Sequence, residues 1–402
     1  MLYINLSMTL TKSYLNRSLI NINDVIYGTN KFMSGIVSDN TDKQSGLVKT
    51  PVLGPDSGSS DPTVSTNPSA VGARHINTTS GEVFVATDVT AGENIWKGQL
   101  GTDVKPPSYF GARGVMGGGQ ASGGESNVLD YVTIATTGNA TDFGDLLVAN
   151  AIGGSHVSSG SRGVIGGGDT TNVLQYFAFA TTGNTTDFGD LVGNHYYPSA
   201  VSNGTRGVWI AGQADNSSAP MDYLTISSLG NASDFGDYVA NTNGGGTCMS
   251  DVRGVYMGGH NGSAAVDTMA YITTATTGNA TDFGDLVDVA VYSVPGACSN
   301  GTRGVIGGGA EPGSPSIKTD RINYITIANT GNSTDFGDLI TGRANMGGCF
   351  SDGTKGLWCG GKSPALRNQI EYVNIASIGD ATDFGDLTDA RDTGAGLSGD
   401  AS

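Results

Sequence analysis

Thr277-Gly278-Asn279-Ala280-Thr281-Asp282-Phe283-Gly284-Asp285-Leu286 is one of six nearly identical stretches in this sequence. Its constant part is Asp-Phe-Gly-Asp, which follows a Gly-Asn or Gly-Asp turn in every copy. Repetition at a fixed spacing indicates that one structural unit is built several times, so the repeat decides the fold. The six copies of this motif are Asp142–Asp145, Asp187–Asp190, Asp234–Asp237, Asp282–Asp285, Asp335–Asp338 and Asp383–Asp386.

Each repeat opens with Arg or Lys, then Gly, a hydrophobic residue and a Gly-rich segment, and a Tyr-containing hydrophobic run follows before the motif. The spacing between openings is 44 to 52 residues, with about four strand-sized segments per repeat. This period predicts one propeller blade per repeat and a six-bladed β-propeller over residues 107–402. The openings are Arg113, Arg162, Arg206, Arg253, Arg303 and Lys355.

The composition agrees with an all-β protein and limits its partners. The chain has 64 Gly and only 14% charged residues, which suits a fold with many tight turns. Its formal net charge is −17, and such an acidic surface should repel nucleic-acid phosphate and anionic lipid. We therefore expect no nucleic-acid partner. No apolar run approaches the roughly 18 residues that a membrane-spanning helix requires, so no membrane span is expected.

The sequence of residues 1–106 predicts three further parts. Residues 1–50 have mixed polarity and no repeat, without the apolar core of a cleavable leader, and are expected to be an extended anchoring segment. Residues 51–72 are rich in Pro, Ser, Thr and Gly, which is typical of a linker. Residues 73–106 predict a small β-hairpin element that turns at Thr79-Ser80-Gly81, with Trp96 as its apolar centre.

This small element resembles a segment of bacteriophage tail-fibre and other virion-appendage proteins, in which a Ser-Gly-Glu/Asp hairpin precedes Ala-Gly-x-x-x-Trp. The resemblance covers about residues 75–98. The repeats resemble the kelch-like propeller family through the Gly-Gly after a hydrophobic strand, but the third repeat has Ala211-Gly212 and all copies lack the spaced Tyr and Trp of kelch blades. The Asp-Phe-Gly-Asp variant is also similar to repeat proteins of marine phages and cyanophages.

The first repeat lacks a strand before its opening, whereas the chain continues after Leu387 with the pattern of that missing strand. The C-terminal residues are therefore predicted to supply the inner strand of the first blade and to close the propeller, which removes an exposed edge.

Cys248, Cys298 and Cys349 fall at one equivalent position of successive repeats. Three thiols at one level indicate either a thiol or metal cluster near the axis or three small buried side chains. The second interpretation is favoured, because free Cys behaves as a small hydrophobe and no Cys-x-x-Cys spacing occurs. Cys359 is expected in the core.

Paired carboxylates such as Asp282 and Asp285 are typical of acid–base catalysis or of calcium sites. Six equal copies argue against a single active site, so structural hydrogen bonding in turns is favoured, with weak calcium sites as the alternative. Arg113 and its equivalents are expected to bond carbonyls or acids of neighbouring blades. The aromatic ring of each motif is expected to be buried between blades, at Phe143, Phe188, Phe235, Phe283, Phe336 and Phe384.

The alternative function is a glycan-processing propeller enzyme, either sialidase-like or a depolymerase. Residues 351–358 resemble the sialidase Asp box, but Asp352 lies one residue too early, and nearly all propeller arginines occupy repeat positions. The four histidines have no metal-ligand spacing. We therefore expect no catalytic residues, no metal and no cofactor.

Alternation of antiparallel strands places the loops that differ between repeats on one face, which is the predicted recognition surface, unless these loops are merely solvated. Tyr beside Asn and His suits a glycan or a protein ligand. Together these features predict a structural phage virion protein, a tail fibre or appendage assembled in the host cytoplasm as a homo-oligomer. Its N-terminal region would bind other virion proteins, and its propeller would bind the host surface or pack in the particle. The candidate surface residues are His195, Tyr196, Tyr197, His260, Asn261, Tyr292 and Asn368.

Overall fold

The computed structural model describes residues 56–62, 66, 68–89, 94–99, 103–104, 110–149, 155–168, 171–210, 212, 220–239, 242–287, 295–311 and 314–400. Every regular element among these residues is a β-strand, so the all-β class is confirmed. The chain divides into two compact units between Pro106 and Pro107, and each is described by itself. The expected anchoring segment, residues 1–50, lies outside the described residues.

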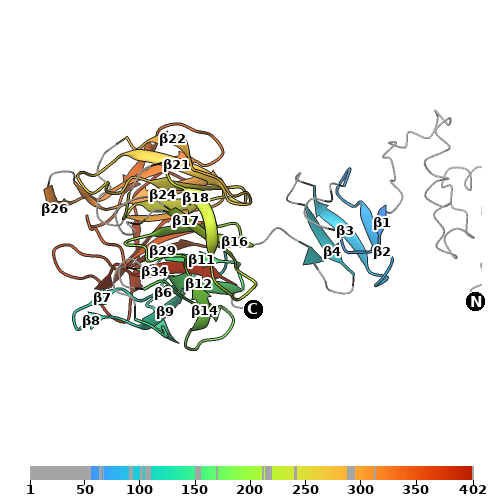
Figure 1. Ribbon diagram of the computed structural model, residues 1–402, viewed down its shortest axis with the longest axis horizontal. Coiled ribbons are helices and arrows are strands. Elements are labelled where there is room, and N and C mark those ends of the chain that lie inside the picture. Colours follow the sequence, from blue (N-terminus) through green and yellow to red (C-terminus); the bar gives the residue numbers. More distant parts are fainter. Residues whose placement is uncertain are drawn as a thin grey trace, which may run out of the picture. The chain divides into compact units, whose positions relative to one another are not determined.

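The small unit is a single sheet whose strands follow one another in the order β1-β2-β3-β4-β5 (Figure 1). The predicted hairpin is present, because β2 and β3 pair antiparallel around Ser80 and Gly81. Phe84 and Trp96 are buried at its centre. β1 lies inside the stretch expected to be a linker and pairs in parallel with β2, so the sheet is larger than a hairpin. The strands are β1 (Asp56–Gly58), β2 (Arg74–Asn77), β3 (Val83–Asp88), β4 (Ile95–Gly98) and β5 (Asp103–Val104).

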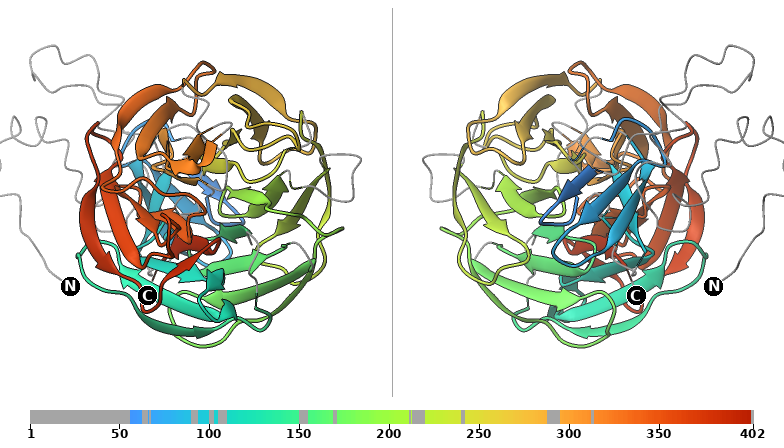
Figure 2. Two further views of the ribbon diagram at one scale, coloured as in Figure 1. Left: turned by 90° about the vertical axis from the view of Figure 1, so that its left-hand side faces the viewer. Right: turned by 90° about the vertical axis from the view of Figure 1, so that its right-hand side faces the viewer.

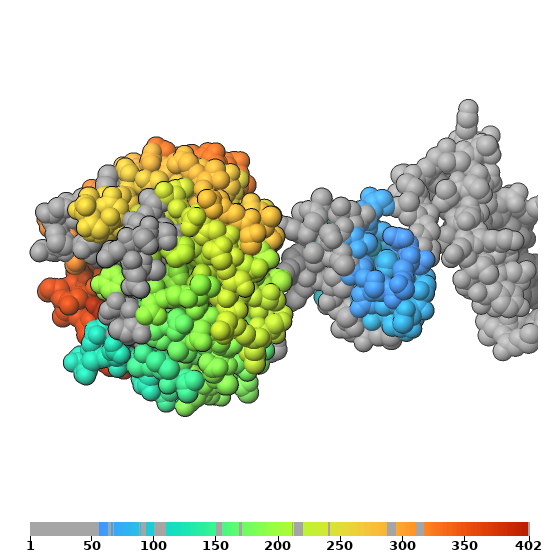
Figure 3. Space-filling view, in the orientation of Figure 1, coloured from blue at the N-terminus to red at the C-terminus, as the bar shows by residue number. Residues whose placement is uncertain are grey.

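The larger unit contains six four-stranded antiparallel sheets, one for each repeat. We name the sheets 1 to 6 in chain order and their strands a, b, c and d from the innermost outward. In every repeat the Arg/Lys-Gly opening forms strand b, the Tyr-containing run forms strand c and the Asp-Phe-Gly-Asp motif forms strand d. In Figure 3 successive repeats lie side by side over the surface of this unit.

In sheets 1 to 3 the strands, in the order a to d, are β34 (Ala395–Gly399), β6 (Arg113–Gly117), β9 (Val128–Thr133) and β10 (Thr141–Asp145); β11 (Ser155–Ser158), β12 (Arg162–Gly166), β13 (Val173–Ala178) and β14 (Thr186–Asp190); and β15 (Ser199–Ser202), β16 (Arg206–Ile210), β17 (Pro220–Thr225) and β18 (Ser233–Asp237).

In sheets 4 to 6 the strands, in the same order, are β19 (Gly246–Met249), β20 (Arg253–Met257), β21 (Thr268–Thr273) and β22 (Thr281–Asp285); β23 (Gly296–Ser299), β24 (Arg303–Gly307), β27 (Arg321–Thr326) and β28 (Thr334–Asp338); and β29 (Gly348–Ser351), β30 (Lys355–Cys359), β31 (Gln369–Asn374) and β32 (Thr382–Asp386).

Sheet 1 combines the two ends of the larger unit. β34, the last strand of the chain, pairs antiparallel with β6, and Leu397 lies opposite Val115. This is the pairing that the tail sequence predicts. The a strands contact one another in the order β34, β11, β15, β19, β23 and β29, and β29 contacts β34 again. Figure 2 shows the six sheets around a common centre.

The core of the larger unit is divided into six apolar clusters, and each lies between two consecutive sheets. The cluster around Phe283 combines Met257 of sheet 4 with Ile306 of sheet 5. The cluster around Phe384 combines Leu357 of sheet 6 with Met116 of sheet 1. The motif rings therefore lie between neighbouring sheets, and all six are at most 2% exposed. They are Phe143, Phe188, Phe235, Phe283, Phe336 and Phe384.

The glycine of the motif permits a bulge and a close approach to the next repeat. Gly284 has a φ of 140°, and the register of β21 with β22 shifts beside it. A Cβ atom at Gly284 would lie 2.5 Å from the carbonyl oxygen of Gly331, in the c–d turn of the next sheet. This turn donates from Gly331 N to Phe283 O over 2.7 Å, so the outer edge of each sheet is paired with its neighbour.

Candidate functional site

The repeated cations at the start of strand b join neighbouring sheets. Arg253 lies over the ring of Tyr271 in its own sheet, 4.1 Å from the ring centroid, and donates to Ile327 O of the next sheet over 2.9 Å. Lys355 makes the corresponding contact with sheet 1, where its Nζ donates to Ala135 O over 2.8 Å. The expectation that these cations bond carbonyls of the neighbouring repeat is confirmed. The positive charges of these side chains therefore contact aromatic rings and carbonyl oxygens within the larger unit.

The carboxylates of the motif do not carry the hydrogen bonds that we expected of them. The backbone N–H of Asp285 donates to Asn332 Oδ1 over 3.0 Å, so the backbone and the neighbouring turn make the contact. The side-chain oxygens of Asp282 and Asp285 accept no hydrogen bond from described residues. Within the described residues, no group of three or more His, Cys, Asp or Glu side chains is placed to hold a metal ion.

Differences between the repeats are concentrated on one face, which we call the variable face. It consists of the b–c loops and the d–a crossings, the segments that lead from strand d of one sheet to strand a of the next. The b–c loop of sheet 1 forms the hairpin β7 (Gln120–Ala121) and β8 (Gly124–Glu125). That of sheet 5 forms β25 (Ala310–Glu311) and β26 (Ser314–Lys318). In Figure 1 β7, β8 and β26 lie on the same, left-hand side of the larger unit.

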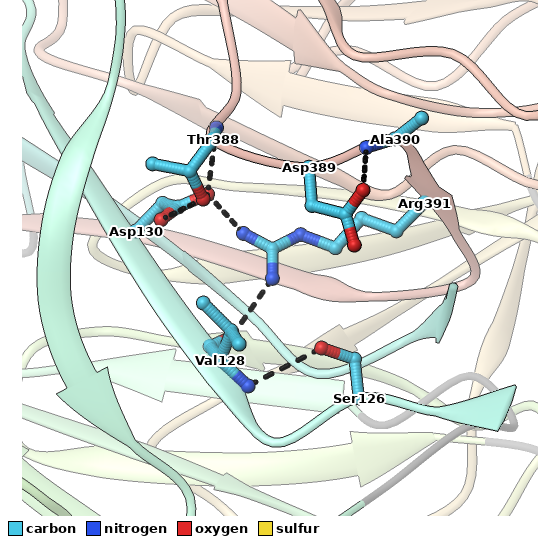
Figure 4. Close-up of polar contacts among 7 residues, drawn as sticks. All are labelled: Ser126, Val128, Asp130, Thr388, Asp389, Ala390 and Arg391. Atoms are coloured by element: carbon cyan, nitrogen blue, oxygen red, sulfur yellow. Dashed lines mark hydrogen bonds and ion pairs between the residues drawn. The ribbon is translucent and has the colours of Figure 1, made fainter. Parts of the chain in front are cut away.

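Three crossings are anchored by a buried basic side chain that pairs with an acid in strand c of the following sheet. Arg391 donates to Asp130 in sheet 1 (Figure 4), and its Nη1 also donates to Val128 O over 3.0 Å. Arg391 belongs to the short strand β33 (Arg391–Asp392), which pairs with β7. Removing one partner of a buried ion pair costs roughly 3–5 kcal/mol, so this pair fixes the path of the crossing.

The second pair joins Arg343 and Glu371 between sheets 5 and 6, with 3.2 Å from Nη2 to Oε1 and both side chains fully buried. Burial lowers the pKa of Arg343, and the nearby Glu371 carboxylate opposes that shift. Burial also raises the pKa of Glu371, which Arg343 opposes. Desolvation thus disfavours each charge, and the partner compensates.

The third pair corrects a sequence-based expectation. His195 was expected on the recognition surface, but it is only 1% exposed, and its Nε2 lies 3.0 Å from Asp222 Oδ2. It occupies the place that Arg343 and Arg391 occupy in their crossings. The reason is that a buried carboxylate in strand c requires a polar partner above it. His195 therefore anchors the crossing and is not available to a ligand.

Tyr196 and Tyr197 follow His195 and are partly exposed. Their rings meet edge to face, with centroids 4.5 Å apart and planes at 80°. Tyr197 has a φ of 50°, in the left-handed region that a bulky side chain rarely adopts. Gly244 N donates to Tyr197 O over 3.0 Å and so holds this conformation. Among the predicted surface residues, these two form a preorganised aromatic pair on the variable face.

The remaining predicted surface residues are not brought together. His260 bridges Asn243 and Ala265, and its Nδ1 accepts from Gly262 N over 3.0 Å. Asn261 is exposed, but its Oδ1 accepts from Ala264 N over 2.9 Å and so closes its own turn.

Asn368 is also exposed, and its carbonyl accepts from Leu387 N over 2.7 Å. Tyr292 lies outside the described residues. These positions leave Tyr196 and Tyr197 as the best-defined ligand-sized feature among the described parts of the surface.

Sequence reasoning did not identify the cavity of about 110 Å³ that lies among the a strands. Serines at the ends of these strands connect neighbouring sheets, as Ser158 Oγ does by donating to Ser398 O over 2.7 Å. His156 also lines the cavity, and its Nδ1 accepts from Gly396 N over 3.3 Å. Burial lowers the pKa of His156 to about 4, so the imidazole is neutral near pH 7. A sequence signal for this cavity is the serine that recurs a few residues before strand b, at Ser158, Ser202, Ser299 and Ser351.

The cysteines are buried, in agreement with the favoured interpretation. All four are free thiols, and Cys298 and Cys349 also line the cavity. Burial raises the pKa of Cys248 and raises that of Cys359 to about 12. Thiols with raised pKa values are poor nucleophiles and poor metal ligands at neutral pH, which fits a packing role.

Within the described residues, no helix is long and apolar enough to cross a membrane. Comparison of the chain with protein-family models and with curated proteins gives no match.

Proposed function

We propose that residues 107–402 form a closed six-bladed β-propeller of kelch-like type that works as a binding module and not as an enzyme. The six four-stranded sheets, the cyclic order of contacts between their a strands and the pairing of β34 with β6 support the fold. An enclosed ring of sheets gives a rigid platform, and rigid platforms with differing loops suit recognition.

One observation carries the binding role. The repeated residues are occupied by contacts between sheets, as Arg253 and Phe283 illustrate, whereas the differences between repeats lie on the variable face. Anchored crossings such as that of Arg391 hold this face in place. The face therefore presents fixed side chains to a ligand, which reduces the ordering cost of binding.

We further propose that the protein is a phage virion component, a tail fibre or appendage. This rests on the resemblance of residues 75–98 to segments of such proteins and on the order of parts, with an unrepeated N-terminal region before a repetitive β array. In this proposal the N-terminal region attaches a homo-oligomer to other virion proteins, and the propeller contacts a glycan or protein of the host surface.

Purified phage particles provide the test. Mass spectrometry should find the chain in the particle, and adsorption to host cells should fall when Tyr196→Ser is introduced. Leu229→Ser is the matched control, because Leu229 is 58% exposed but lies in a c–d turn on the opposite face. Absence of the chain from particles would refute the virion assignment. Equal adsorption by wild type and Tyr196→Ser particles would refute a host-binding role for this part of the variable face.

A further inference from the structure

Four of the d–a crossings share a positive φ at one equivalent position. This position lies two residues after the one that holds His195, Thr242, Arg343 or Arg391, and its φ is 50° at Tyr197, 64° at Gly244, 52° at Asn345 and 52° at Thr393. Equivalent positions in one chain provide an internal comparison, because the fold imposes the same backbone on different side chains. Gly and Asn adopt this region at low cost, whereas Tyr and Thr do so at a penalty.

The two costly residues differ in how their side chains are used. Thr393 is 4% exposed and donates from Oγ1 to Asp392 Oδ1 over 3.2 Å, so packing and hydrogen bonding account for it. The ring of Tyr197 is partly exposed and rests on Tyr196. Strained residues cluster at ligand-binding sites, so the strain at Tyr197 points to a role for its partly exposed ring.

The surroundings hold this aromatic pair rigidly. His195, directly before it, is fixed by Asp222 and forms an antiparallel bridge with Gly168. On the other side, Gly244 N donates to Tyr197 O. A Cβ atom at Gly212 would lie 3.1 Å from His195 Cβ, so the backbone at Gly212 also packs closely against this crossing. The rings are therefore positioned before a ligand arrives, which favours binding.

The size of the pair decides which ligand fits it. A fully buried aromatic side chain contributes about 150–250 Å² and these two rings are only partly exposed, whereas a stable protein interface covers about 800 Å² on each side. Asn194, two residues before Tyr196 in the chain, is exposed and carries a hydrogen-bonding amide. An exposed aromatic ring with an amide close to it in the chain suits a pyranose, which packs its C–H groups on a ring and offers hydroxyls at its edge.

We propose that Tyr196 and Tyr197 form a stacking site for a pyranose ring of a saccharide. The inference rests on the proposed binding role of the variable face and names its ligand class. Tyr197 supplies the ring in a conformation that a smaller residue would adopt more readily, and Tyr196 supports it from the edge. In this proposal, the strained backbone at Tyr197 holds the ring in a fixed position for the sugar.

The test uses the full-length protein and the methyl glycosides of glucose, galactose, mannose and N-acetylglucosamine. Saturation transfer from protein to sugar, measured by NMR, should occur with at least one of them. Tyr197→Asn should weaken binding by about tenfold or more, while the melting temperature stays equal or rises, because Asn relieves the strain. Tyr197→Phe should retain binding, since the ring face remains. Asn345→Gly is the matched control at the equivalent backbone position and should leave sugar binding unchanged.

Absence of transfer to all four glycosides, or undiminished transfer with Tyr197→Asn, would overturn the proposal. A fall in melting temperature of Tyr197→Asn would also count against it, because the strain argument requires the opposite. Host adsorption separates this inference from the proposed function. Normal adsorption of Tyr197→Asn particles, with reduced adsorption after changes in other loops of the variable face, would refute the sugar site alone. Lost sugar binding with unchanged adsorption by all such variants would refute the adhesin role alone.

Discussion

Replacing Phe384 with alanine tests whether the sheets form a closed ring. Phe384 lies between sheets 6 and 1, and its counterpart Phe283 lies between sheets 4 and 5. Both rings are 2% exposed. Phe384 meets Tyr372 at 5.9 Å and Phe283 meets Tyr271 at 6.1 Å, edge to face in each case. The environments of the two rings are therefore matched. The difference is that Phe384 lies next to sheet 1, which combines the first and last strands of the larger unit.

Loss of a buried Phe side chain costs about 3–5 kcal/mol through lost transfer energy and the cavity left behind. The lost contact between the two aromatic rings accounts for about 0.5–1.5 kcal/mol of this total. We expect Phe384→Ala and Phe283→Ala to lower the free energy of unfolding by the same amount within about 1 kcal/mol. The free energies come from urea titrations of the full-length protein with unchanged m values.

Leu229→Ala is the control, because an exposed side chain should change the free energy of unfolding by no more than about 0.5 kcal/mol. If Phe384→Ala costs much less than Phe283→Ala, the contact between sheets 6 and 1 is weak, and the closed ring is wrong. If both cost less than about 1 kcal/mol, the clusters between sheets are not the main core of the unit.

Two further predictions concern the ends of the chain and the central cavity. Deleting residues 389–402 removes β34 and Arg391, so the truncated protein should lose the cooperative unfolding of the larger unit that we expect in a thermal scan of the full-length protein; an identical melting curve would contradict this. His156 has a lowered pKa of about 4, so its contribution to stability is complete above the unfolded value of 6.5 and is lost as the pH falls toward 4. The wild type should lose about 2 kcal/mol more stability than His156→Gln between pH 7 and pH 4.5 in urea titrations, and parallel losses would refute the role of His156.

The repeat predicted much of the fold, because period and strand pattern are local properties of the sequence. The Tyr-containing run and the Asp-Phe-Gly-Asp motif each form one strand, as β27 and β28 do in the fifth repeat. The small unit was underestimated, because β1 is only three residues long and its parallel pairing with β2 has no local signal. The role of the motif carboxylates was also misjudged, since a sequence pattern does not separate backbone from side-chain hydrogen bonds.

The buried ion pairs were missed because their members lie far apart in the sequence. His195 and Asp222 are separated by 27 residues, and Asp130 and Arg391 by 261. An alignment of the six repeats on strand c contains a signal that could have predicted buried polar pairs. The third residue of that strand is polar in five repeats, although it faces the core. These residues are Asp130, Gln175, Asp222, Asn323 and Glu371, with Ala270 in the remaining repeat.

The alignment also explains how scaffold and variable face are coupled. The N–H of the second residue after the motif donates to a side chain of the next sheet. Where the c–d turn offers a hydroxyl, that hydroxyl accepts, as Thr185 Oγ1 does from Leu147 N over 2.7 Å. Where the turn has alanine, as at Ala232, the strand c acid accepts, as Asp222 Oδ2 does from Val192 N over 2.9 Å.

A buried acid at this point then requires a hydrogen-bonding partner, and the crossing supplies a basic side chain directly before the residues that it displays. The anchor of Tyr196 and Tyr197 is thus His195, which pairs with the buried carboxylate of Asp222 in strand c of sheet 3. Displayed residues can change while the anchor keeps the crossing in place. A surface with these properties can change its displayed side chains at little cost to the stability of the sheets.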